Sequence, residues 1–114
     1  MYKLANKLPS VEILKEKFEI DPSIPSGLRW KVERRGPKTP GNSAGRSTQG
    51  YYQTRVNGVH FYNSRIIWKM INGNDPENVI DHIDGNPSNN NLSNLQDITQ
   101  SQNLRKKAGE IINA

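Results

Sequence analysis

Asp81 and His82 stand side by side in the chain, followed by Asn94 and Asn103, and these side chains are suited to metal-assisted hydrolysis. Aspartate is a hard oxygen ligand appropriate for Mg²⁺, and histidine titrates near neutrality, so it can take a proton from water. A metal ligand beside a general base is the minimum that hydrolysis of a phosphodiester requires. This cluster is therefore the first candidate for a site.

By itself, an Asp-His pair more often belongs to a surface loop than to a site, and the two later amides reverse that balance. Asn103 offers a neutral amide oxygen, which is a useful ligand when a carboxylate and a phosphate share the ion. Asn94 closes a turn-rich segment and is well placed to bind loop backbone, so we interpret it as architectural. Asp84 precedes a glycine and is interpreted as a turn residue. His60 has no acidic or histidine neighbour, which favours a packed or surface position.

Short elements must position this cluster. Val79 and Ile80 predict a brief strand that leads into the acid and the histidine. Adjacent side chains of a regular strand point to opposite faces, so these two groups could not serve one small site if the strand ran on undisturbed. Gly85 and Pro87 therefore predict that the chain is already turning at this point.

A second strand and a helix are predicted after the loop. Residues 95–98 form the candidate strand, and residues 99–102 match the capping box that begins a helix. The helix is expected to run to about Lys107, which puts Asn103 in its first turn. The candidate ligands thus lie at the end of one strand and at the start of the helix.

The first fifty residues predict a short helix, a strand and a basic loop. Residues 11–18 have helical spacing after the candidate cap Ser10, and Asp21-Pro22 is expected to end this helix. Residues 28–32 alternate apolar with basic side chains, as a half-exposed strand does. Residues 33–50 are rich in glycine, proline and basic residues, which indicates a loop.

A hairpin and a second helix are predicted next. Residues 51–56 and 59–62 flank an Asn-Gly dipeptide, which suits the positive dihedrals of a two-residue turn. Residues 64–71 predict a helix that ends at Asn72-Gly73. Its expected apolar stripe is Ile67, Trp68 and Ile71, with Arg65 and Lys69 on the outside.

Composition narrows the class of protein. The chain has 114 residues, of which 32% are hydrophobic, so one domain with extended arms is expected. Its 16 basic and 11 acidic residues give a net charge of +5, which suits a polyanionic partner or simply a soluble basic protein. The absence of cysteine excludes disulfides, zinc thiolates and cysteine nucleophiles. With no apolar run or signal-peptide core, a cytoplasmic protein without membrane contact is expected.

Residues 81–86, Asn94-Leu95 and Asn103 together resemble the motif of HNH endonucleases, specifically the phage and intron-homing branch of the His-Me finger (ββα-metal) nucleases. The core resemblance runs from Val79 to about Lys107, and residues 44–73 loosely resemble the segment that precedes the motif in small phage members. The resemblance implies an α+β fold with a small His-Me finger core, preceded by a hairpin and a helix. Residues 1–50 would form a basic, DNA-contacting extension, and residues 51–114 the nuclease domain.

The resemblance also implies roles for the motif residues. Asp81 and Asn103 would ligate one divalent ion, Mg²⁺ in the first place and Mn²⁺ as the second candidate. His82 would be the general base, and Asn94 would complete the catalytic set by steadying the loop. Gln96 stands where relatives often have arginine, so one phosphate contact is expected to be missing.

Double-stranded DNA is the partner that the resemblance implies, within the host cytoplasm if a phage encodes the protein. Whether the chain is a monomer or a homodimer stays open. The alternatives are a non-catalytic DNA-binding protein on an HNH scaffold, and a protein whose basic surface binds an acidic partner. The basic loop by itself is typical of a solvated segment, but the motif beside it favours phosphate contact. The basic residues after Asn103 suit a helix C-terminus as well as a DNA backbone. The expected DNA contacts are Arg29, Trp30, Arg34, Arg35, Lys38, Arg46, Arg55, Arg65, Arg105 and Lys106.

Overall fold

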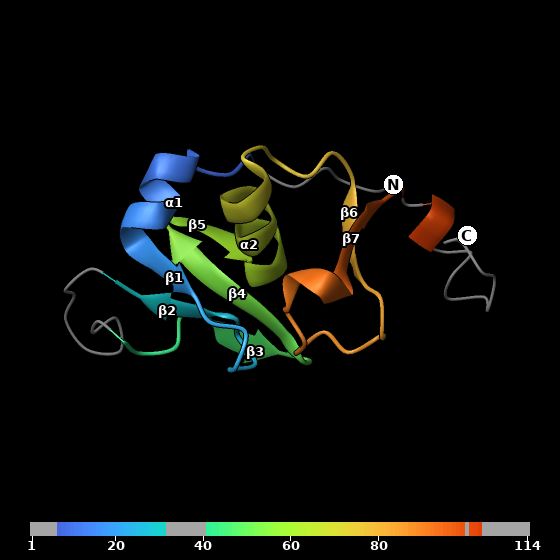
Figure 1. Cartoon of the computed structure of the whole chain (residues 1–114), viewed down its shortest axis with the longest axis horizontal. Coiled ribbons are helices and arrows are strands. Elements are labelled where there is room, and N and C mark those ends of the chain that lie inside the picture. The colour runs from blue at the N-terminus through green and yellow to red at the C-terminus, as the bar shows by residue number, and fades with distance from the viewer. Residues whose placement is uncertain (1–6, 32–40, 100, 104–114) are drawn as a thin grey trace.

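Helix α2 (Asn63–Asn72) lies between the N-terminal helix α1 (Val11–Lys17) and a hairpin of β6 (Val79–His82) and β7 (Leu95–Ile98), as Figure 1 shows. The computed structural model describes residues 7–31, 41–99 and 101–103. Within these ranges, no helix is long and apolar enough to cross a membrane. The arrangement agrees with the expected α+β class.

Helix α1 begins as the sequence predicts but ends earlier. The Ser10 hydroxyl accepts a hydrogen bond from the Ile13 N–H at 3.3 Å, which confirms the predicted cap. The predicted stop at Asp21 was wrong, because the chain passes directly into β1 (Phe18–Ile20). This strand pairs antiparallel with β2 (Leu28–Trp30), and the rings of Phe18 and Trp30 pack 4.7 Å apart. Burial of these rings outweighs continuation of a short helix.

A three-stranded antiparallel sheet contains the predicted hairpin. Strands β4 (Tyr51–Val56) and β5 (Val59–Tyr62) are joined by Asn57 and Gly58, whose φ angles of 51° and 82° suit the two-residue turn. Strand β3 (Arg46–Thr48) pairs with the other edge of β4 and was not predicted. It lies in the segment read as a loop, and its three exposed polar residues carry no apolar alternation.

The predicted apolar stripe of helix α2 is confirmed at Ile67 and Trp68 and is wrong at Ile71. Asn63, Ile66, Ile67 and Met70 are buried, as their spacing on one face requires, whereas Ile71 is 46% exposed. The helix ends at Gly73 in the left-handed conformation, as predicted. Ile71 was misassigned because it also has helical spacing from Ile67.

Lys69 of α2 is buried, although the sequence placed it outside. Its Nζ forms an ion pair with Asp75 Oδ1 at 2.6 Å and donates a hydrogen bond to the Leu8 carbonyl at 3.2 Å. The Leu8 N–H in turn donates to Asp75 Oδ2 at 2.9 Å. Burial alone would raise the pKa of Asp75, but the bonds from Lys69 and Leu8 lower it overall. The pair therefore fixes the segment before α1 against α2.

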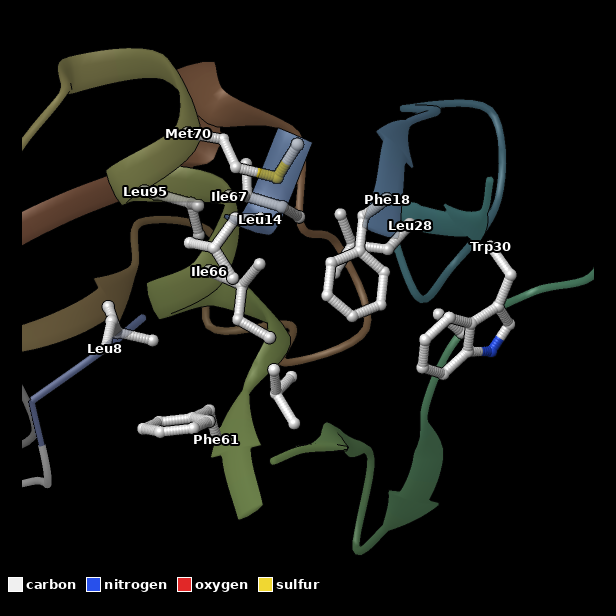
Figure 2. Packing of buried hydrophobic residues seen from close by; sticks show 12 residues of the cluster. Leu8, Leu14, Phe18, Leu28, Trp30, Phe61, Ile66, Ile67, Met70 and Leu95 are labelled. Atoms are coloured by element: carbon white, nitrogen blue, oxygen red, sulfur yellow. The ribbon is translucent and has the colours of Figure 1, made fainter. Parts of the chain in front are cut away.

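One apolar cluster joins both halves of the chain. Leu14, Phe18 and Leu28 from the N-terminal elements are buried in the same cluster as Ile66 and Ile67 of α2. Figure 2 shows these side chains with Met70 and Leu95 on the α2 side of the cluster. Core residues therefore lie on both sides of residue 50, and the division into an extension and a nuclease domain stays a prediction.

Candidate active site

Asp81 and His82 are the last two residues of β6. The strand pairs antiparallel with β7 through four successive partners, which end at Asp81 with Gln96 and His82 with Leu95. The expectation that the chain already turns here was wrong, because the ladder continues through His82 and the turn begins at Ile83. The two side chains therefore project from opposite faces of the strand.

The Asp81 carboxylate is held by its cross-strand partner. Gln96 Nε2 donates a hydrogen bond to Asp81 Oδ2 at 2.8 Å. Glutamine has the reach to span directly opposed positions of an antiparallel pair. Gln96 therefore orients the proposed metal ligand. It stands at the position where the HNH relatives often have arginine.

His82 is only 7% exposed and is packed among polar and aromatic groups. Its Nε2 lies 2.8 Å from Asn90 Oδ1, and its ring meets the ring of Tyr51 edge-on, with centroids 6.0 Å apart. Tyr51 begins β4, so the imidazole lies where the β6–β7 hairpin meets the three-stranded sheet. These contacts restrict the orientation of the ring.

Asn94 closes the loop between the two strands. Its Oδ1 accepts from the Asp84 N–H at 2.9 Å, and its Nδ2 donates to Asp84 Oδ1 and to the Asn89 carbonyl, each at 2.9 Å. The Ile83 N–H donates to the Asn94 carbonyl at 2.8 Å. These bonds agree with the architectural interpretation of Asn94, because they tie the two ends of the loop together.

Asp84 acts as a turn residue within this loop. Hydrogen bonds from the Asn89 side chain, the Asn86 N–H and the Asn94 side chain lower the pKa of Asp84 to about 2. Its carboxylate oxygens accept hydrogen bonds within the loop, as expected for a turn residue. Such bonds favour the charged carboxylate over the protonated form, which is why the pKa of Asp84 is lowered.

We expect the loop to weaken in acid because of Asp84. Its folded pKa of about 2 is below its unfolded value of about 3.9, so its stabilising contribution is complete above pH ~4 and is lost as the pH falls through about 2. Urea unfolding of wild type and Asp84→Asn, followed by tryptophan fluorescence, measures this contribution. The stability difference between the two proteins should shrink between pH 4 and pH 2; a difference that stays constant there would contradict the assignment.

The start of the helix after β7 agrees with the sequence prediction. Gln102 N–H donates to Thr99 Oγ1 at 3.1 Å, and Thr99 N–H donates to Gln102 Oε1 at 3.0 Å, which confirms the capping box. Asn103 lies in this first turn and is 8% exposed. The predicted continuation to Lys107 lies outside the described residues.

A comparison with protein families finds a match between residues 61–105 and the family model of HNH endonucleases. The matched segment runs from β5 through α2 and the β6–β7 hairpin to the helix that follows. Residues 61–105 form an HNH endonuclease domain. HNH endonucleases are phosphodiester hydrolases. Neither the curated proteins nor the solved structures gave a match.

The two residues expected to hold the metal have side chains of a type that fits a hard divalent cation. Asp81 would supply a carboxylate and Asn103 an amide oxygen, which are ligand types that Mg²⁺ and Mn²⁺ accept. Within the described ranges, no three histidine, cysteine or acidic side chains lie together as a metal site. An ion on two protein oxygens needs water and phosphate oxygens to complete its shell, which agrees with binding alongside the substrate.

The predicted DNA contacts lie in different environments. Arg46 and Arg55 are exposed on β3 and β4. Arg29 pairs with Asp21 at 2.7 Å and donates to the Gly41 carbonyl at 2.7 Å, so its guanidinium already supports the β1–β2 turn. Arg34, Arg35, Lys38, Arg105 and Lys106 lie outside the described residues.

Two predicted contacts have structural environments that disfavour the assignment. Trp30 is 6% exposed in the core, and a buried indole cannot stack on a base. Arg65 donates to the carbonyls of Asn78 at 2.8 Å and Pro76 at 3.4 Å, so it holds the segment that leads into β6. The basic neighbours of Trp30 in the sequence gave no indication that its indole is buried.

Three residues around the site were not predicted. Asn90 and Tyr51 contact His82, and Gln96 contacts Asp81. Asn90 lies in a run of three asparagines, and nothing in the run distinguishes it from its neighbours. For Gln96, the register of the predicted strands was a usable signal, because it places the glutamine opposite Asp81.

Proposed function

We propose that this protein is a metal-dependent endonuclease that hydrolyses phosphodiester bonds of double-stranded DNA. The observation that carries the proposal is the pair Asp81 and His82 at the end of β6, held by Gln96 and Asn90, within the HNH domain. The exposed basic sheet described below supports duplex DNA as the substrate.

His82 takes a proton from the attacking water as the water oxygen bonds to phosphorus. The bond from phosphorus to the leaving oxygen breaks, and that oxygen is protonated. Asp81 and Asn103 would hold a divalent ion, Mg²⁺ in the first place, which would supply stabilisation of the developing charge when bound. Asp81 and His82 project from opposite faces of β6, so they do not line one small pocket. Such an arrangement suits in-line displacement, in which the attacking water and the leaving oxygen lie on opposite sides of the phosphorus.

The duplex docks on the outer sheet face, which we define as the residues of β3, β4 and β5 that point away from the core. Cross-strand partners share a face, so the partners Arg46, Gln53 and Tyr62 lie together there, whereas Thr54 and Phe61 on the other face are buried. The three strands contain no aspartate or glutamate. Tyr51 and Arg55 also belong to the outer sheet face, because they alternate with Gln53 along β4.

Tyr51 connects the outer sheet face with the catalytic histidine. Its ring packs edge-on against Tyr62 with centroids 5.9 Å apart, and against His82 with centroids 6.0 Å apart. Tyr51 is 43% exposed and Tyr62 44% exposed, which leaves both rings accessible to a ligand. A DNA backbone that follows Arg46 and Arg55 across the outer sheet face would therefore pass Tyr51, next to His82.

Incubation with supercoiled plasmid tests the proposed function. We expect Mg²⁺ or Mn²⁺ to support conversion to open-circular or linear DNA, and a chelator to prevent it. A protein that binds the plasmid and leaves it intact with both ions would instead be the alternative, a non-catalytic DNA-binding protein on an HNH scaffold.

The loose resemblance of residues 44–73 to small phage members supports placing the protein in the phage and intron-homing branch.

Arg46→Ala and Arg55→Ala are each expected to weaken DNA binding without changing sequence preference. Each removes a phosphate contact, so the slope of log affinity against log salt concentration should fall by about 0.9 per variant. Fluorescence anisotropy with a labelled duplex over a salt series measures the slope. Lys15→Ala is the matched control, because it removes one exposed charge from α1. Equal slopes for all four proteins would exclude the outer sheet face as the docking surface.

A further inference from the structure

We propose that Asn90 is a positioning residue that holds His82 in one tautomer, with the proton on Nε2, so that Nδ1 is the nitrogen that acts as base. Its catalytic consequence rests on the proposed nuclease function. Asn90 is 4% exposed and lies in the loop between β6 and β7, outside the four motif residues.

The neighbours of Asn90 determine which way its amide faces. Its Nδ2 lies 3.2 Å from the carbonyl oxygen of Pro25 and 3.4 Å from that of Ser26. Carbonyl oxygens only accept hydrogen bonds, so the donating NH₂ group must face them. The amide oxygen then faces His82 Nε2 at 2.8 Å. Since this oxygen can only accept, Nε2 must carry the proton, and a neutral imidazole has its lone pair on Nδ1.

The carbonyls that orient Asn90 belong to a turn that is itself fixed. The Ser26 carbonyl also accepts from Asn63 Nδ2 at 3.0 Å, and Asn63 is fully buried at the start of α2. Thr54 Oγ1 donates to Asn63 Oδ1 at 2.6 Å, which sets the orientation of that second amide. The turn, Asn63 and Asn90 thus form one buried polar network in which each amide has a defined direction.

Gly27 completes the fit between this turn and the loop. Its φ is +75°, and a Cβ at this position would lie 3.1 Å from Asn90 Cβ and 2.7 Å from Ile67 Cδ1. The turn therefore packs directly against Asn90 with no room for a side chain. Because this turn precedes the matched segment, residues outside the HNH domain contribute to positioning its histidine.

The bond from His82 to Asn90 suits a histidine that gains and loses a proton. Nε2 donates to Asn90 Oδ1 in the neutral ring and in the imidazolium alike, so the ring keeps its place throughout a proton transfer at Nδ1. A group held in this way needs no reorientation between turnovers, which is the advantage of a preorganised site.

Nitrogen NMR of the metal-free protein, labelled at histidine, tests the tautomer directly. Correlations between ring nitrogens and ring carbon-bound protons distinguish the two neutral tautomers, and His82→Ala assigns the signals of the two histidines. We expect the Nε2–H tautomer for His82 in wild type and in Asn74→Leu, the same substitution at an exposed asparagine outside the loop. Asn90→Leu should show a mixture of tautomers. A wild-type protein in the Nδ1–H tautomer would overturn the proposal without any variant.

Single-turnover cleavage at saturating enzyme tests the catalytic consequence. Asn90→Leu should slow cleavage by about 10- to 100-fold, the usual effect of removing a group that orients a catalytic or metal-binding side chain, with DNA affinity unchanged. Asn74→Leu should cleave at the wild-type rate. An Asn90→Leu protein with the wild-type NMR pattern and rate would refute the positioning role. The expected NMR pattern in a protein that never cleaves DNA would instead refute the nuclease function and leave the tautomer assignment standing.

Discussion

His82→Ala is expected to lower the single-turnover rate of DNA cleavage by about 10²- to 10⁴-fold, the range for losing a general base. His82 follows Asp81 at the end of β6 and is bonded to Asn90. Loss of its imidazole removes the proposed proton acceptor and leaves the ladder between β6 and β7 in place. DNA affinity should change little, because the proposed phosphate contacts lie on the outer sheet face. Rates measured at saturating enzyme separate the chemical step from binding.

His60→Ala is the control for the chemical step alone. His60 is the other histidine of the chain and is exposed on β5 opposite Arg55, so it lies on the outer sheet face and not beside Asn90. Its rate at saturating enzyme should stay within a few-fold of wild type. Robust cleavage by purified His82→Ala, with a chelator control to identify contaminating nuclease, would remove His82 from the role of base.

Asp81→Asn is expected to lower the cleavage rate by about 10²-fold or more, since loss of charge stabilisation worth several kcal/mol corresponds to at least two factors of ten. The substitution keeps the size of the side chain and an oxygen that can accept from Gln96, so the local fold should persist. The divalent-ion concentration needed for half-maximal rate should also rise. A titration of Mn²⁺ against the single-turnover rate measures both effects.

Glu19→Gln is the control for removing one carboxylate, because Glu19 is exposed on β1, away from the β6–β7 hairpin. It should have the wild-type rate and ion requirement. If Asp81→Asn shares the ion dependence of wild type and differs in rate alone, the ligand role is wrong, and Asp81 acts on the reaction in another way.

Local patterns predicted the parts of the fold that local chemistry decides. The Asn57-Gly58 turn, the Ser10 cap and the capping box at Thr99 all depend on groups a few residues apart, and the structure confirms each of them. Val79 and Ile80 likewise predicted β6, although the strand continues two residues further than expected. The motif residues were recognised in the same way, because the spacing from Asp81 to Asn103 carries the signal.

Contacts between distant segments decided the rest. The sequence predicts that Lys69 is exposed, but in the structure it contacts Asp75 and Leu8. It likewise predicts a surface position for Trp30, which instead packs against Phe18. Asn90 is 64 positions from Ser26 in the chain, and no short-range pattern links the two. Tertiary burial overrides local preference in all three cases.

The core shared between the N-terminal elements and α2 means that the HNH domain is not a transferable cassette. Cutting the chain to residues 61–105 would expose Ile66 and Ile67 to water, because the cluster they belong to includes Leu14, Phe18 and Leu28. The same cut would take away the two carbonyls that orient Asn90. A graft of residues 61–105 onto another DNA-binding protein would therefore have to include the N-terminal elements. A shorter insert would lose the core of the fold and the contacts that orient His82.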